Sequence, residues 1–119
     1  MRKLHFINKD YLKYKDLMDK LTTYDKKYFE IGEFYTENGV VYISGVVKAN
    51  VDGYTVVNVI PYKYAPRKAA YGFINCTASS LDVGKVNIIN AEINGGIYVW
   101  TSKLNYNEIF TIQYPLKVE

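Results

Sequence analysis

From Tyr28 onward the hydrophobic pattern of the chain has a period of two, and turn-forming residues interrupt it at short intervals. A period of two is typical of β-strands, because successive side chains of a strand point to opposite faces. Short strands at this spacing favour a mostly β fold, an antiparallel β-sandwich or jelly roll. The predicted strands span residues 28–35, 40–48, 54–60, 69–77, 85–91, 97–101 and 108–114.

Glycine-containing pairs and triplets lie between several of these runs and predict hairpin turns. Asparagine, aspartate and glycine tolerate the positive φ angles that tight hairpin turns need. The predicted turns are Asn38-Gly39, Asp52-Gly53 and Asn94-Gly95-Gly96.

The N-terminal part has a different period, since apolar residues recur there every three or four positions. This spacing predicts an amphipathic α-helix or short coiled coil, with Asn8 or Asp10 as its N-cap. A helix with so short an apolar stripe is not stable alone, so it must pack against the β-domain, identical chains or a larger structure. The stripe begins at Leu4 and continues through the candidate anchoring and oligomer-interface residues Ile7, Tyr11, Tyr14, Met18 and Leu21.

Basic charge is concentrated in the same N-terminal part. Residues 1–27 carry eight Lys or Arg against four Asp, whereas residues 28–119 carry seven against eight acidic residues. We therefore divide the chain into a basic amphipathic helix at 1–27, for anchoring or trimerisation, and a β-sandwich domain at 28–119.

Length and composition indicate the broad class of protein. A chain of 119 residues fits one domain with one core, and its hydrophobic content of 49% excludes a disordered protein. Apolar runs fall short of the ~20 residues that cross a bilayer, and charges interrupt the N-terminus before a signal-peptide core forms. We expect a soluble, unsecreted protein. Its single cysteine, Cys76, allows no intrachain disulfide and is expected to be buried.

Several predicted strands are apolar on both faces. In VVYISGVV, for example, valines and a tyrosine occupy the face opposite Val41, Ile43 and Val47. Antiparallel sandwiches usually alternate apolar-in with polar-out, so two-sided strands indicate that the second face is also covered, as in a homo-oligomer. The alternative is that tyrosine, with its polar hydroxyl group, is tolerated at the surface.

Catalytic and metal-binding patterns are not found in the sequence. His5 and Cys76 are single and lie in different regions, which argues against a transition-metal site. No nucleophile has a histidine base in its region, and the glycines fit no phosphate-binding loop. We expect no cofactor and no enzymatic activity. Two alternatives remain: a glycan-processing enzyme using paired carboxylates, and a nucleic-acid or partner-binding module acting through the basic helix.

The stretch VIPYKYAPRKAAYGF connects two predicted strands through two prolines. Proline cannot donate to a strand ladder, so the strand ends at Ile60 and a stiff loop follows. Tyrosines and basic residues project from this loop. They are suited to covering the end of the sandwich, or to contacting sugar rings and anionic polymers.

Four successive segments, NGVVYISGVVKA, GYTVVNVIPYKYAPRKAAYGF, INGGIYVWTS and EIFTIQYPL, resemble the C-terminal head domains of bacteriophage tail-fibre, baseplate and head-fibre proteins. Those domains share a glycine-marked kink, a proline-tyrosine-proline loop, a glycine turn before a short aromatic strand, and a closing strand with a tyrosine. The resemblance covers residues 33–116. The family usually has a glycine between Tyr62 and the second proline, where this chain reads YKYAP.

The resemblance implies a β-sandwich or jelly roll, a parallel homotrimer, and attachment to host-surface glycan, teichoic acid or protein. The protein would then lie on the head or tail surface of a virion, with its N-terminal helix docked on a capsid or tail protein. The alternation of Trp100 with Val99 favours a place for Trp100 in the core or trimer interface. The candidate receptor-binding residues are Tyr62, Tyr64, Arg67, Tyr98 and Trp100.

Overall fold

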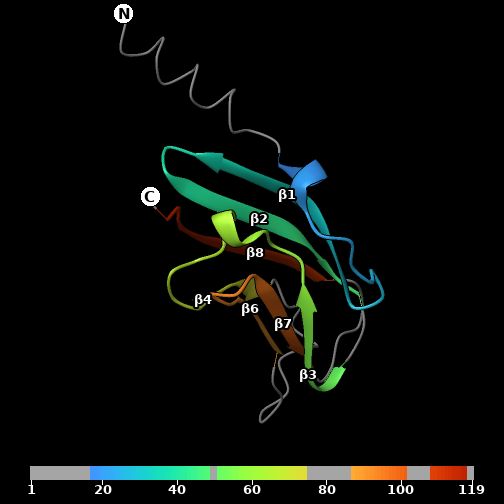
Figure 1. Ribbon diagram of the computed structural model, residues 1–119. Coiled ribbons are helices and arrows are strands. Elements are labelled where there is room, and N and C mark those ends of the chain that lie inside the picture. The colour runs from blue at the N-terminus through green and yellow to red at the C-terminus, as the bar shows by residue number, and fades with distance from the viewer. Residues whose placement is uncertain (1–16, 49–50, 75–86, 102–107, 118–119) are drawn as a thin grey trace, which may run out of the picture.

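A computed structural model describes residues 17–48, 51–74, 87–101 and 108–117, which form strands and two short 3-10 turns (Figure 1). The 3-10 turns are η1 at Met18–Lys20 and η2 at Tyr62–Tyr64. The strands are β1 at Phe29–Glu37, β2 at Val40–Val47, β3 at Val51–Asn58, β4 at Ala70–Tyr71, β5 at Phe73–Ile74, β6 at Asn87–Ala91, β7 at Gly96–Thr101 and β8 at Glu108–Pro115.

The strands form two four-stranded antiparallel sheets (Figure 1). Sheet A has the order β1-β2-β8-β5, and sheet B has the order β3-β7-β6-β4. One hydrophobic cluster draws buried residues from both sheets, so the arrangement is sandwich-like. The prediction of a mostly β chain with antiparallel sheets is confirmed.

Alternation along each strand determines which side chains enter the core. In β8, Phe110 and Ile112 are buried and point inward, whereas Ile109 and Thr111 are exposed. The two sheets contribute these buried core residues: Phe29, Phe34, Val41, Ile43, Val47, Ile89, Ile97 and Val99. The outward side chains of β2 are half-buried within this single chain. Strand β2 is therefore apolar on both faces, as the sequence indicates.

One side of the two sheets is closed by a strand that changes sheet at Gly72. β4 pairs with β6 in sheet B, and β5 pairs with β8 in sheet A. A Cβ atom at position 72 would lie 2.6 Å from the carbonyl oxygen of Thr111 and 2.6 Å from Cγ1 of Ile112. Glycine is required because only a residue without a side chain lets the strand pass so close to β8.

The opposite side is covered by residues 17–28, here called the edge segment. The Leu17 N–H donates to the carbonyl of Phe34 in β1 at 2.8 Å, and the Thr22 N–H donates to the carbonyl of Val59, just after β3, at 2.9 Å. β1 and β3 are the edge strands of their sheets. The edge segment thus supplies partners to backbone groups that would otherwise remain exposed at both edges.

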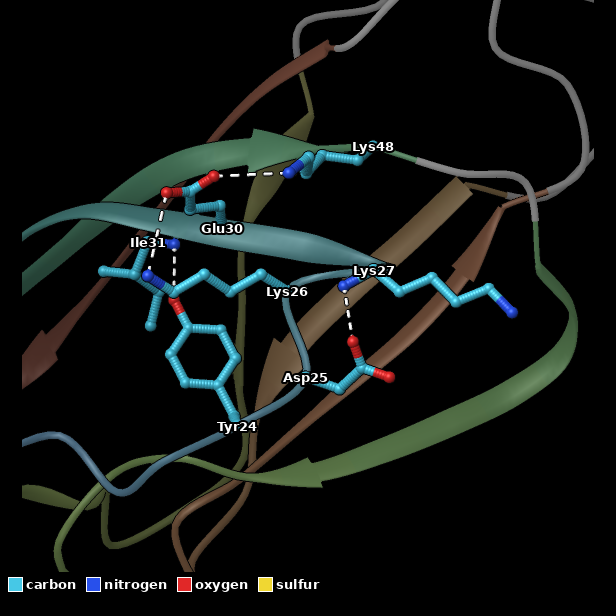
Figure 2. Close-up of polar contacts among 7 residues, drawn as sticks. All are labelled: Tyr24, Asp25, Lys26, Lys27, Glu30, Ile31 and Lys48. Atoms are coloured by element: carbon cyan, nitrogen blue, oxygen red, sulfur yellow. Dashed lines mark hydrogen bonds and ion pairs between the residues drawn. The ribbon is translucent and has the colours of Figure 1, made fainter.

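Figure 2 shows how the second half of the edge segment is fixed on β1. The Tyr24 hydroxyl accepts a hydrogen bond from the Ile31 N–H at 2.9 Å, beside an irregularity in the β1 ladder between Ile31 and Glu33. The carboxylate of Glu30 lies between the ammonium groups of Lys26 and Lys48, at 3.9 and 3.3 Å. These exposed ion pairs contribute little to stability.

The structure differs from the predicted helix over the part of residues 1–27 that it describes. Only the single turn Met18–Lys20 is helical, and the chain then continues without helix to β1. Met18 and Leu21 pack partly against the core of their own chain. The edge segment is not helical beyond Lys20 because its backbone groups form hydrogen bonds with the edges of both sheets. A continuous helix could not make these bonds. Ile7, Tyr11 and Tyr14 lie outside the described residues.

Two of the three predicted turns are confirmed. Asn38 and Gly39 have φ angles of 52° and 78° and join β1 to β2, and the Asn94-Gly95-Gly96 turn leads from β6 into β7. The third prediction is wrong, because Asp52 and Gly53 lie inside β3. There the register against β7 shifts between Val51 and Thr55, so the glycine marks a bulge rather than a reversal.

No helix among the described residues has the length and apolar character needed to cross a membrane.

Candidate functional site

The proline loop, residues 61–69, is anchored at its base on the β6–β7 turn. The N–H groups of Val59 and Ile60 both donate to the carbonyl of Gly95, at 3.2 and 3.0 Å. Pro61 then starts the η2 turn, which is closed by the Tyr64 N–H donating to the Pro61 carbonyl at 2.9 Å. The loop is therefore an ordered connection between the sheets, as expected from its two prolines.

Tyr64 was a predicted receptor contact, but its side chain belongs to the core. Its exposed fraction is 7%, and its ring meets that of Phe34 edge-on at 5.9 Å between centroids. Its carbonyl accepts a hydrogen bond of 2.6 Å from the hydroxyl of Tyr114. Burial raises the pKa of that Tyr114 phenol above its ordinary value, so the group remains a hydrogen-bond donor. Tyr64 therefore fixes the loop on the core, and its ring does not project into solvent.

Tyr62 and Arg67 are placed on the surface of the loop. Tyr62 is 74% exposed, and the ammonium group of Lys117 lies 3.4 Å from its ring centroid. This cation–π contact orients the ring without covering it. Arg67 and Lys68 are exposed and border a groove of about 410 Å³, which also includes Gln113 and Tyr114. We call this hollow the cationic groove.

Tyr98 and Trp100 lie elsewhere, on the outward face of β7 in sheet B. Both are half-buried, and the register places Tyr98 beside Asn90 and Trp100 beside Ile88 on β6. Neither residue lines the cationic groove. The predicted receptor-binding set is therefore divided between the loop, the core and a sheet face.

A second hollow, which the sequence analysis missed, lies on the outward face of sheet A. Its volume is about 250 Å³, and we call it the aromatic hollow. It is lined by Glu33, Tyr35, Tyr42, Ile43, Ser44, Tyr71, Phe73, Thr111, Ile112 and Gln113. These residues come from β1, β2, β4, β5 and β8.

One signal in the sequence points to part of this hollow. A two-residue turn at Asn38-Gly39 fixes the hairpin register, which pairs Glu37 with Val40 and therefore Tyr35 with Tyr42. The two rings are indeed stacked, with 5.1 Å between centroids and 17° between planes. The same register pairs Glu33 with Ser44. The lining residues of β4, β5 and β8 could not be found this way, because these strands are distant in sequence from the hairpin.

The polar groups of the described residues form no metal-binding cluster and include no unsatisfied buried side-chain atom. Among them there is no group of three or more His, Cys, Asp or Glu placed to hold a metal ion. All buried side-chain nitrogen and oxygen atoms in this part of the chain have hydrogen-bond partners. The two hollows are adjacent, since Gln113 borders both.

Comparisons of this chain with known protein families, with curated proteins and with solved structures gave no match. Its function is therefore inferred from its own residues and their geometry.

Proposed function

We propose that this chain is a non-enzymatic fibre or spike protein of a bacteriophage virion, located on the head or tail surface. Three copies assemble into a homotrimer whose sandwich-like domains contact a host-surface glycan, teichoic acid or protein. The proposal is supported by the segments that resemble phage fibre heads, which correspond to β2, to β3 with the proline loop, to β7 and to β8.

The observation that carries the proposal is the unequal charge of the two outward sheet faces. The central strands of sheet B, β6 and β7, contain no charged residue, and Tyr98 and Trp100 project outward from β7. The nearest acid is Glu92, just after β6, whose carboxylate accepts a hydrogen bond from Asn90 at 2.6 Å. On sheet A, β1 places Glu33 and Glu37 on the outward face, together with Glu30, which is ion-paired with Lys26 and Lys48. Identical copies that met through sheet A would bring like charges together, so we assign sheet B to self-association.

The proline loop then remains open to the host. Tyr62 supplies an exposed aromatic ring, and Arg67 and Lys68 supply positive charge beside a groove. Aromatic rings with nearby cations suit sugars and anionic surface polymers. The N-terminal residues 1–16, with five Lys or Arg against two Asp, would attach to an acidic surface of a capsid or tail protein.

Light scattering on the full chain tests the assembly. We expect a mass three times the 13.7 kDa of one chain. Trp100→Glu places a charge on the outward face of sheet B and should give monomers. Ile109→Glu, on the outward face of sheet A, is the matched control and should leave the trimer intact. A wild-type protein that stays monomeric at micromolar concentration contradicts the trimer.

Binding of fluorescently labelled protein to cells of a panel of bacterial strains tests attachment. The double variant Tyr62→Ala with Arg67→Ala should lose binding to strains that the wild type labels, while its circular dichroism spectrum is unchanged. Ile93→Ala, an exposed side chain at the β6–β7 turn, is the control and should bind normally. Unchanged labelling by the double variant would limit the proline loop to a structural role.

A further inference from the structure

Two of the most exposed aromatic side chains of the described residues stand together at the aromatic hollow. Phe73 has an exposed fraction of 81% and Tyr71 one of 69%. The change of sheet at Gly72 places them on either side of the corner, and both line the hollow. Large apolar groups gathered at one hollow are typical of a binding site.

Polar groups occupy the space between the aromatic residues. Strand order places Tyr35 and Tyr42 towards the β1 edge of sheet A and Phe73 at its β5 edge, with Thr111 and Gln113 on β8 between them. Ser44 pairs with Thr111 in the ladder, and its hydroxyl donates to Oε1 of Glu33 at 3.3 Å. The hollow thus combines aromatic rings with the aliphatic hydroxyls of Ser44 and Thr111, an amide and a carboxylate.

We propose that the aromatic hollow binds one pyranose residue of a neutral glycan. A pyranose ring has C–H faces that pack on aromatic rings and hydroxyls that both donate and accept, which matches hydroxyl, amide and carboxylate side chains. The volume of about 250 Å³ lies below the range of about 300–1,000 Å³ of pockets for drug-sized ligands. A single sugar ring is a ligand of suitable size.

Charge selects the class of sugar. Among the described residues that line the aromatic hollow, Glu33 alone is charged, so an anionic sugar or a phosphate group is repelled there. Arg67 and Lys68 border the cationic groove instead, beyond Gln113. The carboxylates of Glu33 and Glu37 on the same face also oppose its burial against a second copy of the chain.

The biological role of this site rests on the proposed attachment function, but sugar binding is measured separately. Saturation-transfer difference NMR is recorded on the full chain with the methyl glycosides of glucose, galactose, N-acetylglucosamine and rhamnose as probes. Methyl glucuronide and glycerol phosphate are the anionic probes. We expect saturation transfer to at least one neutral glycoside and none to the anionic probes.

Two variants and a control locate the binding. Phe73→Ala should weaken binding of the neutral glycoside about tenfold by removing an exposed aromatic face. Glu33→Gln keeps the hydrogen-bonding shape and removes the charge, so it should admit methyl glucuronide. Ile109→Ala changes a 55% exposed side chain on the same sheet face outside the hollow and should bind like the wild type.

The outcomes separate this inference from the attachment function. Binding of the neutral glycoside could survive Phe73→Ala and be lost in the Tyr62→Ala, Arg67→Ala variant. That result overturns the assignment of sugar binding to the aromatic hollow, and attachment through the proline loop still stands. No transfer to any neutral glycoside, together with labelling of bacterial cells, overturns the sugar class alone. Transfer only to the anionic probes also overturns it. If the wild-type protein binds a neutral glycoside but labels no bacterial strain, the attachment function is contradicted instead.

Discussion

At the scale of single residues, the hydrogen bond from Tyr114 to the Tyr64 carbonyl ties the proline loop to sheet A. The contact measures 2.6 Å and is buried, so water cannot replace it. Tyr64 itself packs edge-on against Phe34. The position of the proline loop is therefore fixed by contacts with the core.

Replacing Tyr114 by phenylalanine should lower the free energy of unfolding by about 1–2 kcal/mol, because the Tyr64 carbonyl is left without its buried donor. Urea unfolding measures the difference. Tyr62→Phe, which removes an exposed hydroxyl, should change the stability by less than about 0.5 kcal/mol. Equal stability of the Tyr114 variant and the wild type would show that the bond contributes nothing net.

The same residue predicts an alkaline pH dependence. Burial raises the pKa of Tyr114 in the folded chain above the value of about 10 of an unfolded tyrosine. Above pH ~10 the unfolded chain releases this proton and the folded chain keeps it, so the stability falls as pH rises. Tyr114→Phe should reduce that slope in urea unfolding, and an unchanged slope would contradict this assignment.

At the scale of elements, both open sides of the two sheets are closed, by different means. On one side a continuous strand crosses from sheet B to sheet A at Gly72. On the other side the edge segment donates backbone N–H groups to carbonyls of Phe34 and Val59. These contacts occupy some of the backbone groups at the sheet edges that could otherwise pair with other chains.

Gly72→Ala should destabilise the fold by about 1–3 kcal/mol, as overpacking does, because its Cβ would meet β8 at 2.6 Å. Gly32→Ala is the matched control, since its nearest neighbour would be the Ser44 carbonyl at an ordinary 3.8 Å. Thermal unfolding of both variants gives the comparison. A Gly72 variant as stable as the Gly32 variant would mean that the corner can widen freely.

Tyr24→Phe tests the attachment of the edge segment to β1. The variant removes the acceptor of the Ile31 N–H, so we expect amide hydrogen exchange at Ile31 to accelerate about tenfold. The amide of Ile43, in the interior strand β2, serves as the internal reference and should keep its protection. Unchanged exchange at Ile31 would indicate that this contact does not hold the edge.

At the scale of the whole molecule, the two outward sheet faces differ in chemistry. Sheet A carries the β1 glutamates and the aromatic hollow, whereas the central strands of sheet B are uncharged. This difference is the basis for assigning sheet B to contact between copies and sheet A to ligand. The proline loop and its cationic groove adjoin the aromatic hollow through Gln113.

The proposed trimer predicts a melting temperature that rises with protein concentration, since association stabilises the folded state by mass action. Differential scanning fluorimetry between about 1 µM and about 100 µM measures this dependence. Trp100→Glu should abolish the rise, and Ile109→Glu should preserve it. A wild-type melting temperature independent of concentration argues for a monomer.

The sequence by itself determined the strands and the faces of their residues, because alternation, turn residues and prolines act within a few positions of the chain. The predicted strands 28–35, 40–48, 97–101 and 108–114 match β1, β2, β7 and β8 closely, whereas the predicted strand 69–77 is divided at Gly72 into β4 and β5. The Asn38-Gly39 turn already pairs Tyr35 with Tyr42. Asp52-Gly53 was misassigned because glycine serves bulges as well as turns. The helical period of the edge segment was overridden at 17–28 by hydrogen bonds to both sheets.

Only the tertiary structure decided which surfaces these strands build. Thr111 and Phe73 extend the local Glu33–Ser44 pair into one row across sheet A, although they come from strands far from that hairpin in sequence. Tyr64 looks equivalent to Tyr62 in the sequence, yet packing against Phe34 buries it. Such placements depend on pairing between distant strands and on the filling of a shared core, which no local pattern encodes.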